Sequence, residues 1–236
     1  MKFYNAWYCP FAQRAWMALV YKDIDFDYIE IDPYDFTDSW LEISRGFALV
    51  PVVIQSNGSG EDTTIVESLR ILEYLEDYYP ETAPLFADTA NARSQQKFWM
   101  DHIGQKITPC FYRYLKREGG EEAQQKSLNE MLEGLLALTQ AMDSEGPYFS
   151  GDRIDAVDIA LVPFAMRIDV LLSHYRNLEL PKSDDDWRRY HRWYEAMLAL
   201  PAFRATAFDH DDYESRLIAH YSPYNAGGGQ TDVTVV

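Results

Sequence analysis

The first eighty residues alternate short strand-like and helix-like patterns. Apolar side chains at helical spacing predict a helix over residues 11–22. Residues 26–31 alternate apolar and acidic positions, as a half-buried strand does. A glycine-containing turn at residues 57–60 predicts a β-hairpin between the runs on either side of it. The predicted order is βαβαββα, with strands at 2–4, 26–31, 50–55 and 63–66 and helices at 11–22, 40–44 and 67–79.

The pattern changes after Pro80. The segment from Pro80 to Pro84 is typical of a linker. Beyond it the strand-like alternation stops and long helix-permitting segments follow, at residues 92–117, 123–143, 156–173 and 187–200. Asp155 and Asp158 stand where a capping box begins a helix, with Ile154 before the first of them. The second part of the chain is therefore predicted to be all-helical.

These elements predict two domains of different class. A parallel β-α-β unit followed by a hairpin and a helix is the thioredoxin arrangement. The expected fold class is α/β plus all-α, a thioredoxin-like N-terminal domain followed by an all-helical C-terminal domain. The predicted boundaries are 1–80 for the first domain, 81–90 for a linker, 91–225 for the helical domain and 226–236 for a flexible, glycine-rich tail.

Composition and charge narrow the class of partner. With 21 basic and 38 acidic side chains in 236 residues, the net charge of -17 disfavours nucleic acid and anionic membranes. The N-terminus lacks the apolar core of a signal peptide, and no stretch approaches the about 20 apolar residues of a membrane span. We therefore expect a cytoplasmic protein that binds neither nucleic acid nor membrane.

The potential metal ligands do not form a site in the sequence. Two cysteines, Cys9 and Cys110, are too few for a disulfide framework or a zinc site. The acidic run Asp209 to Asp212 contains ligand types, but consecutive residues do not converge on one ion. No metal is expected.

Cys9 stands where a thiol is readily ionised. It follows a short strand and directly precedes Pro10, a residue suited to the first helical position because its missing N–H would be unpaired there. Cys9 is then the N-cap, and the N–H groups and dipole of the helix can lower a cysteine pKa from about 8.5 to about 3.5–7.5. The prediction is a nucleophilic thiolate. The alternative is a buried structural thiol.

Four motifs in order along the chain carry a family resemblance. They are Cys9-Pro10-Phe11-Ala12-Gln13-Arg14, Leu49-Val50-Pro51-Val52, Val66-Glu67-Ser68 with the helix after it, and the capped helix from Asp155 to Leu161. With a thioredoxin-like half and a helical half, they resemble the cytosolic glutathione transferases, specifically the omega or omega-like class that uses a cysteine. The resemblance covers nearly the whole chain.

The resemblance implies a binding site for glutathione as co-substrate. Val50, before a cis Pro51, would pair with the cysteinyl part of glutathione as an added strand does. Glu67 would accept from the γ-glutamyl ammonium, and Ser68 at the helix start would bind the carboxylate. Phe11 would line the site beside the thiol. Val50-Pro51 as an ordinary trans turn, and Glu67 and Ser68 as helix caps, are the alternatives.

Other parts of the predicted site are less specific. Phe111 and Tyr114 could line a pocket for an apolar substrate, although such residues are more often core. Omega proteins usually have a lysine before the second helix to meet the glycine carboxylate of glutathione. The corresponding residues 33–38 contain no basic side chain, and Arg45 is a weak substitute.

The predicted function is a glutathione-dependent thiol transferase or reductase. Cys9 would form a mixed disulfide with glutathione, and Ala12 in place of a second cysteine makes the cycle a monothiol one. Substrates would be glutathionylated or small hydrophobic molecules, with dehydroascorbate-type reduction included. By the resemblance, we expect a homodimer.

Three alternatives remain. A non-catalytic carrier of glutathione or hydrophobic ligands would keep the fold and lose the chemistry. An interaction module of the kind fused to translation factors would not need the thiol. Tyr4 or Tyr8 could instead supply the phenol of tyrosine-type transferases.

Overall fold

A computed structural model describes residues 1–35, 37–58, 60, 62–182, 184–207 and 212–228 of the chain. The chain divides into two compact units, Met1–Leu85 and Phe86–Val236. Most of the predicted tail, residues 229–236, and most of the acidic run, residues 209–211, lie outside the described residues.

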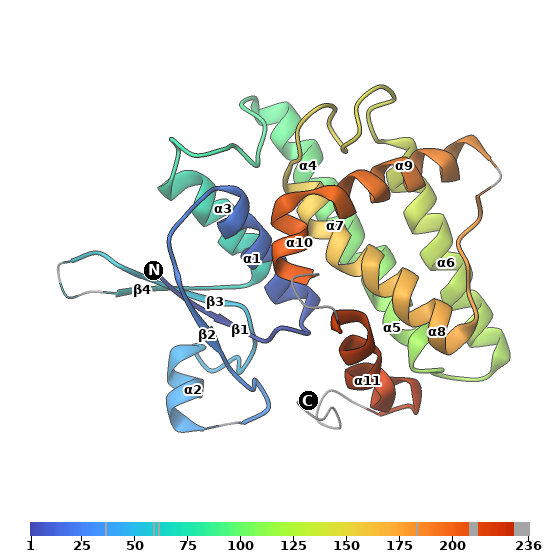
Figure 1. Ribbon diagram of the computed structural model, residues 1–236, viewed down its shortest axis with the longest axis horizontal. Helices are drawn as coiled ribbons and strands as arrows, with labels where there is room; N and C mark the ends of the chain where they lie inside the picture. Colours follow the sequence, from blue (N-terminus) through green and yellow to red (C-terminus); the bar gives the residue numbers. More distant parts are fainter. Residues whose placement is uncertain (36, 59, 61, 183, 208–211, 229–236) are drawn as a thin grey trace. The chain divides into compact units, whose positions relative to one another are not determined.

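The first unit has the predicted order of strands and helices (Figure 1). Its elements are β1 Lys2–Asn5, α1 Pro10–Tyr21, β2 Asp27–Glu30, α2 Asp38–Ile43, β3 Val52–Ser56, β4 Asp62–Val66 and α3 Ser68–Tyr78. The sheet order is β2-β1-β3-β4, with β1 parallel to β2 and antiparallel to β3. β3 and β4 form the predicted hairpin, in which Val52 pairs with Val66. The thioredoxin-like prediction is confirmed.

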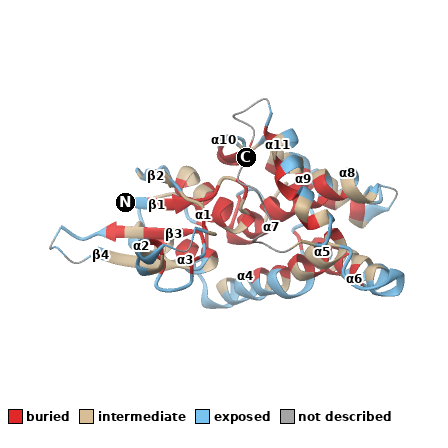
Figure 2. Cartoon of the chain, turned by 90° about the horizontal axis from the view of Figure 1, so that it is seen from below, coloured by how far each residue is buried: buried red, intermediate tan, exposed pale blue. Residues whose placement is uncertain are grey.

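The two central strands carry the core of this unit. Three of the four residues of β1 are buried, and so are most of those of β3 (Figure 2). α1 and α3 pack together on one side of the sheet, and α2 lies on the other (Figure 1). From α2, Trp40 is buried against Tyr4 of β1, with 5.9 Å between ring centroids. The N-termini of α1 and α3 are thus held by one rigid scaffold.

The strand β2 is more exposed than its alternating pattern predicts. Asp27, Tyr28 and Glu30 are all exposed, and Ile29 is intermediate. The reason is position, because β2 is at the edge of the sheet and pairs with β1 alone. Tyr28 packs its ring on Trp16 at a centroid distance of 5.0 Å and still keeps 39% of its surface exposed.

The elements of the second unit are helices throughout its described residues, as predicted. They are α4 Ala90–His102, the π-helical turn η1 Ile103–Ile107, α5 Thr108–Leu115, α6 Glu121–Gln140, α7 Ala156–Arg167, the π-helical turn η2 Ile168–Leu172, α8 Ser173–Arg176, α9 Asp185–Ala199, α10 Pro201–Ala207 and α11 Tyr213–Asn225. The predicted segments 92–117 and 156–173 are each interrupted by a π-helical turn, and α10 and α11 were not identified from the pattern.

The predicted capping box begins α7. Asp155 accepts from the N–H groups of Val157 and Asp158, at 2.8 and 3.3 Å, while Asp158 accepts from the Asp155 N–H at 2.8 Å. Burial and the neighbouring Asp155 raise the pKa of Asp158, and the hydrogen bonds that it accepts oppose that rise. All twelve residues of α7 are buried, so this helix is the centre of the second unit (Figure 2).

None of the helices that the described residues form is long and apolar enough to cross a membrane. Within the same residues, no three His, Cys, Asp or Glu side chains are grouped so that they could hold a metal ion.

Candidate functional site

Cys9 is the N-cap of α1, as the sequence predicts. Its φ and ψ of -78° and 118° are extended, and Pro10 takes the first helical position. The Cys9 N–H donates to Ala6 O at 2.8 Å, and its carbonyl accepts from the Gln13 N–H at 3.0 Å. The thiol is partly exposed. The strand-to-helix turn therefore places the thiol at the positive end of the helix dipole, which favours a thiolate, although its side chain makes no capping hydrogen bond to a first-turn N–H.

Val50 and Pro51 lie beside this thiol. The peptide bond between them is cis, as the resemblance implies, and both residues are buried. The Cys9 Sγ is 3.9 Å from the Val50 carbonyl oxygen, a long contact for a thiol donor. β3 begins directly after Pro51 and pairs with β1, which ends four residues before Cys9. Sheet pairing thus brings together two motifs that are far apart in sequence.

Glu67 and Ser68 form the start of α3. Glu67 is the exposed N-cap and has a φ of 68°, a value that costs a non-glycine residue about 1–3 kcal/mol and is often kept at functional sites. Its carbonyl accepts from the Ile71 N–H at 2.9 Å, so the strained residue still begins the helix. Ser68 is 5% exposed, with its hydroxyl in contact with α1.

Arg14 makes that contact, and it was not singled out as a site residue from the sequence. Its guanidinium is on the second turn of α1, is buried, and donates from Nη1 to Ser68 Oγ at 3.4 Å. Its Cζ also lies 5.2 Å from the centroid of the Phe11 ring. Arg14 therefore joins two predicted site residues. A signal was available, since an arginine at a helix position that faces the core needs a partner.

The phenol alternative concerns Tyr4 and Tyr8, which are both buried. Burial raises the pKa of Tyr8 far above its usual range, and Tyr34, Asp32, Cys9 and Glu30 raise it further. Tyr8 is therefore a neutral phenol at physiological pH, a hydrogen-bond donor rather than a base.

Phe111 and Tyr114 both lie on α5 in the second unit. Phe111 has no exposed surface, and its ring is tilted against that of Tyr112 at a centroid distance of 4.9 Å, so it is a core side chain. Tyr114 is half-buried and carries the guanidinium of Arg176 over its ring, with Cζ 4.3 Å from the centroid. Their part in substrate binding stays a prediction.

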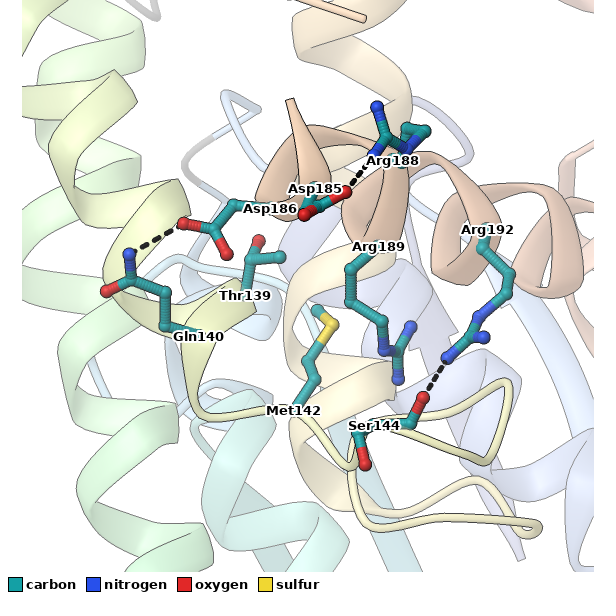
Figure 3. Close-up of a pocket in the computed structure, with 9 residues that line it drawn as sticks. All are labelled: Thr139, Gln140, Met142, Ser144, Asp185, Asp186, Arg188, Arg189 and Arg192. Atoms are coloured by element: carbon teal, nitrogen blue, oxygen red, sulfur yellow. Dashed lines mark hydrogen bonds and ion pairs between the residues drawn. The ribbon is translucent and has the colours of Figure 1, made fainter. Parts of the chain in front are cut away.

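A cavity of about 430 Å³ lies between the end of α6 and the start of α9 (Figure 3). Two of its three arginines hold the adjoining loop, because Arg189 donates to Asp143 O and Tyr148 O at 2.8 Å each and Arg192 to Ser144 O at 2.7 Å. None of the site residues predicted from sequence is among the described residues that line it. We assign this cavity a structural role.

A second cavity, of about 390 Å³, is lined in part by Cys110. Arg113 Nη2 is 3.0 Å from the Cys110 Sγ, and the thiol faces Glu130 Oε2 at 3.6 Å. Burial raises the pKa of Cys110, although Arg113 works against the rise. The two cysteines therefore lie in different surroundings, Cys9 partly exposed at a helix N-terminus and Cys110 buried.

Alkylation with iodoacetamide at pH 7 should label Cys9 at least about tenfold faster than Cys110. The reason is that Cys9 is partly exposed at a helix N-terminus, whereas Cys110 is 2% exposed and has a raised pKa. Peptide mapping by mass spectrometry measures both rates in one sample, and the urea-unfolded chain, in which they should be nearly equal, is the control. Equal rates in the folded protein would contradict this interpretation of Cys9.

Each of the two units matches the model of a known protein family. The model of the glutathione S-transferase N-terminal domain matches residues 3–83, and the model of the glutathione S-transferase C-terminal domain matches residues 121–196. The first match spans Cys9, Val50, Glu67 and Ser68.

Individual proteins are similar over much of their length. A probable glutathione S-transferase GSTU1 of Oryza sativa subsp. japonica is 33% identical over 168 residues, which are 67% of this chain and 69% of the relative. The probable cytosolic glutathione S-transferase DHAR1 of the same plant is 29% identical over 219 residues, 91% of this chain and 89% of the relative. The crystal structure of glutathione transferase Omega 3C from Trametes versicolor superposes with a TM-score of 0.77 and 31% identity, and covers 94% of this chain and 89% of that one.

Proposed function

Because the chain belongs to the glutathione S-transferase family, we propose that it is a glutathione-dependent thiol transferase or reductase of the omega-like, cysteine-using type. Glutathione is the co-substrate. The observation that carries the proposal is the position of Cys9, with its Sγ at the N-terminus of α1 and 3.9 Å from Val50 O. A nucleophilic thiol beside a chain that can pair with a tripeptide is suited to disulfide exchange with glutathione.

The reaction consists of two thiol–disulfide exchanges. In the first, the Cys9 thiolate attacks the glutathione sulfur of a glutathionylated substrate, and the substrate leaves as a thiolate that takes a proton from water. This step leaves glutathione bonded to Cys9. In the second, the thiolate of another glutathione attacks that glutathione sulfur, which releases glutathione disulfide and restores the Cys9 thiolate. Ala12 occupies the position where a second cysteine would resolve the intermediate internally.

Binding of glutathione is proposed at the ends of three elements. The main chain of Val50 pairs with the cysteinyl part, in the manner of an added strand. Ser68 and the N-terminus of α3 bind the γ-glutamyl carboxylate, and Glu67 accepts from the ammonium group. Phe11 lines the site next to the thiol. The left-handed backbone of Glu67 and the burial of Ser68 at the same helix start support these roles.

The proposed cysteine-using class rests on Cys9 and on the similar proteins. The relative named DHAR1 and the omega-class structure, together with Cys9 itself, support the cysteine type. The relative named GSTU1 is at least as similar in sequence. We propose further that the protein is a homodimer, which light scattering on the intact protein tests, and that it works in the cytoplasm, which fractionation of its source cells tests.

Turnover is the test of the proposed activity. The protein should catalyse reduction of the mixed disulfide of glutathione and 2-mercaptoethanol by glutathione, followed as NADPH oxidation through glutathione reductase. The second candidate, a non-catalytic carrier of glutathione or hydrophobic ligands, is favoured by the absence of a basic side chain from residues 33–38. Binding of glutathione without turnover would support the carrier and overturn the transferase.

The glycine end of glutathione should contribute little to its binding. Residues 33–38 contain no basic side chain, and Asp32, which directly precedes them, accepts from the Tyr34 N–H through Oδ1 at 2.9 Å. Glutathione esterified at its glycine carboxylate should therefore have a KM within about threefold of that of glutathione, whereas a lost hydrogen bond to a charged group costs about 1.5–3 kcal/mol, tenfold or more. Initial rates with each thiol measure this.

Cysteinylglycine, which lacks the γ-glutamyl group, is the matched control for that comparison. It should react at least about tenfold less well than glutathione, because it cannot use Glu67 and Ser68. A tenfold loss with the ester would show that a cation elsewhere in the chain, such as the exposed Arg45, meets the glycine carboxylate.

A further inference from the structure

Arg14 lies between two residues that the proposed function assigns to glutathione binding. It is 2% exposed and is on α1, the helix that begins after Cys9. Its Nη1 is 3.4 Å from Ser68 Oγ at the start of α3, and its Cζ is 5.2 Å from the Phe11 ring centroid. A charged side chain is almost never this deeply buried unless a partner compensates it.

The chemistry of the two groups fixes the direction of their hydrogen bond. A guanidinium has donors and no acceptor, so the Ser68 oxygen must accept from Arg14. A hydroxyl has one proton, and that proton is then directed to a different acceptor. Ser68 is the first residue of α3, where backbone N–H groups also point outward. Arg14 therefore makes Ser68 a donor at a helix N-terminus.

An incoming carboxylate would gain from both effects. The hydroxyl proton and the N–H groups of α3 converge on an anion at this place. The positive charge of Arg14 lies 3.4 Å from the Ser68 hydroxyl, in surroundings with little water to screen it. The face of the Phe11 ring contributes a favourable contact to the same guanidinium.

We propose that Arg14 is a positioning residue for the γ-glutamyl carboxylate of glutathione and acts through Ser68. The inference rests on the proposed function, because it needs glutathione in this site. It differs from a purely structural role, in which Arg14 ties α1 to α3 and has no effect on the ligand.

A double-mutant cycle on ligand binding tests the inference. S-Methylglutathione, which cannot form a disulfide, is titrated by calorimetry into the unchanged protein, Arg14→Met, Ser68→Ala and the double variant. Arg14→Met should weaken binding about tenfold when Ser68 is present and less than about twofold when it is absent, because coupled residues are not additive. In turnover, Arg14→Met should raise KM for glutathione and leave kcat unchanged.

Two further variants are controls for the double-mutant cycle. Arg14→Lys keeps the charge and should recover part of the affinity, and it carries the same cycle if Arg14→Met does not fold. Arg70→Met removes an arginine of α3 whose side chain is 56% exposed, and it should change the affinity by less than about twofold. The melting temperature of each variant is measured alongside.

The outcomes are distinguishable. Equal losses of affinity with and without Ser68, or a lower melting temperature with unchanged affinity, would overturn the role of Arg14 and leave the proposed function standing. No binding of S-methylglutathione by the unchanged protein would overturn the glutathione site itself, and the inference with it.

Discussion

Replacing Cys9 by alanine should lower the rate of mixed-disulfide reduction by about a thousandfold or more. Both exchange steps pass through the Cys9 sulfur, so its removal leaves no covalent intermediate. Cys110 cannot substitute, because it is 2% exposed and has a raised pKa. NADPH oxidation in the presence of glutathione reductase measures the loss.

Three controls separate chemistry from folding and binding. Cys9→Ser should be as inactive as Cys9→Ala, because a serine hydroxyl is hardly ionised and forms no disulfide. Cys110→Ala should retain the activity. Cys9→Ala should still bind S-methylglutathione with a Kd within about threefold of the unchanged protein, since the groups that bind the ligand are elsewhere. Full activity of Cys9→Ala would sink the assignment of Cys9 as the catalytic residue.

Replacing Asp158 by alanine should lower the free energy of unfolding of the second unit by about 3–5 kcal/mol. Three buried donors lose their acceptor. They are the N–H groups of Asp155 and Phe149, at 2.8 Å each, and the Trp193 Nε1–H at 2.7 Å. The network joins the start of α7 to the loop before it and to α9. Urea unfolding followed by tryptophan fluorescence measures the change, and the melting temperature should fall by on the order of 10 °C.

Two other substitutions are controls for the loss of stability expected from Asp158→Ala. Asp158→Asn keeps one carbonyl oxygen that can accept from Phe149 and Trp193, so its loss should be smaller. Asp152→Ala removes an exposed carboxylate of the same loop and should change stability by less than about 0.5 kcal/mol. Equal effects of Asp158→Ala and Asp152→Ala would mean that the network does not stabilise the unit.

Several features of the fold could be predicted because their signals are local. The N-cap role of Cys9 follows from the proline after it, and the start of α7 follows from two aspartates at capping-box spacing. The hairpin of β3 and β4 follows from its turn residues. In each case the signal lies within a few residues of the element that it marks, so the pattern is sufficient.

Other features depend on contacts that the pattern does not contain. The exposure of β2 depends on its place at the sheet edge, and the π-helical turns within two predicted helices depend on packing in the second unit. The positive φ of Glu67 has no sequence signal, because a glutamate rarely adopts it without surrounding support.

The sequence by itself therefore determined the order of elements, the two-part organisation and the position of the thiol at a helix start. Tertiary structure decided which groups surround that thiol. The pairing of β1 with β3 brings Val50 to Cys9, and the packing of α1 on α3 buries Arg14 against Ser68. The physical reason is the sequence separation of the interacting residues. Caps and turns are completed by residues a few positions apart. The partner of a buried charge, in contrast, depends on which distant segments pack against one another in the fold.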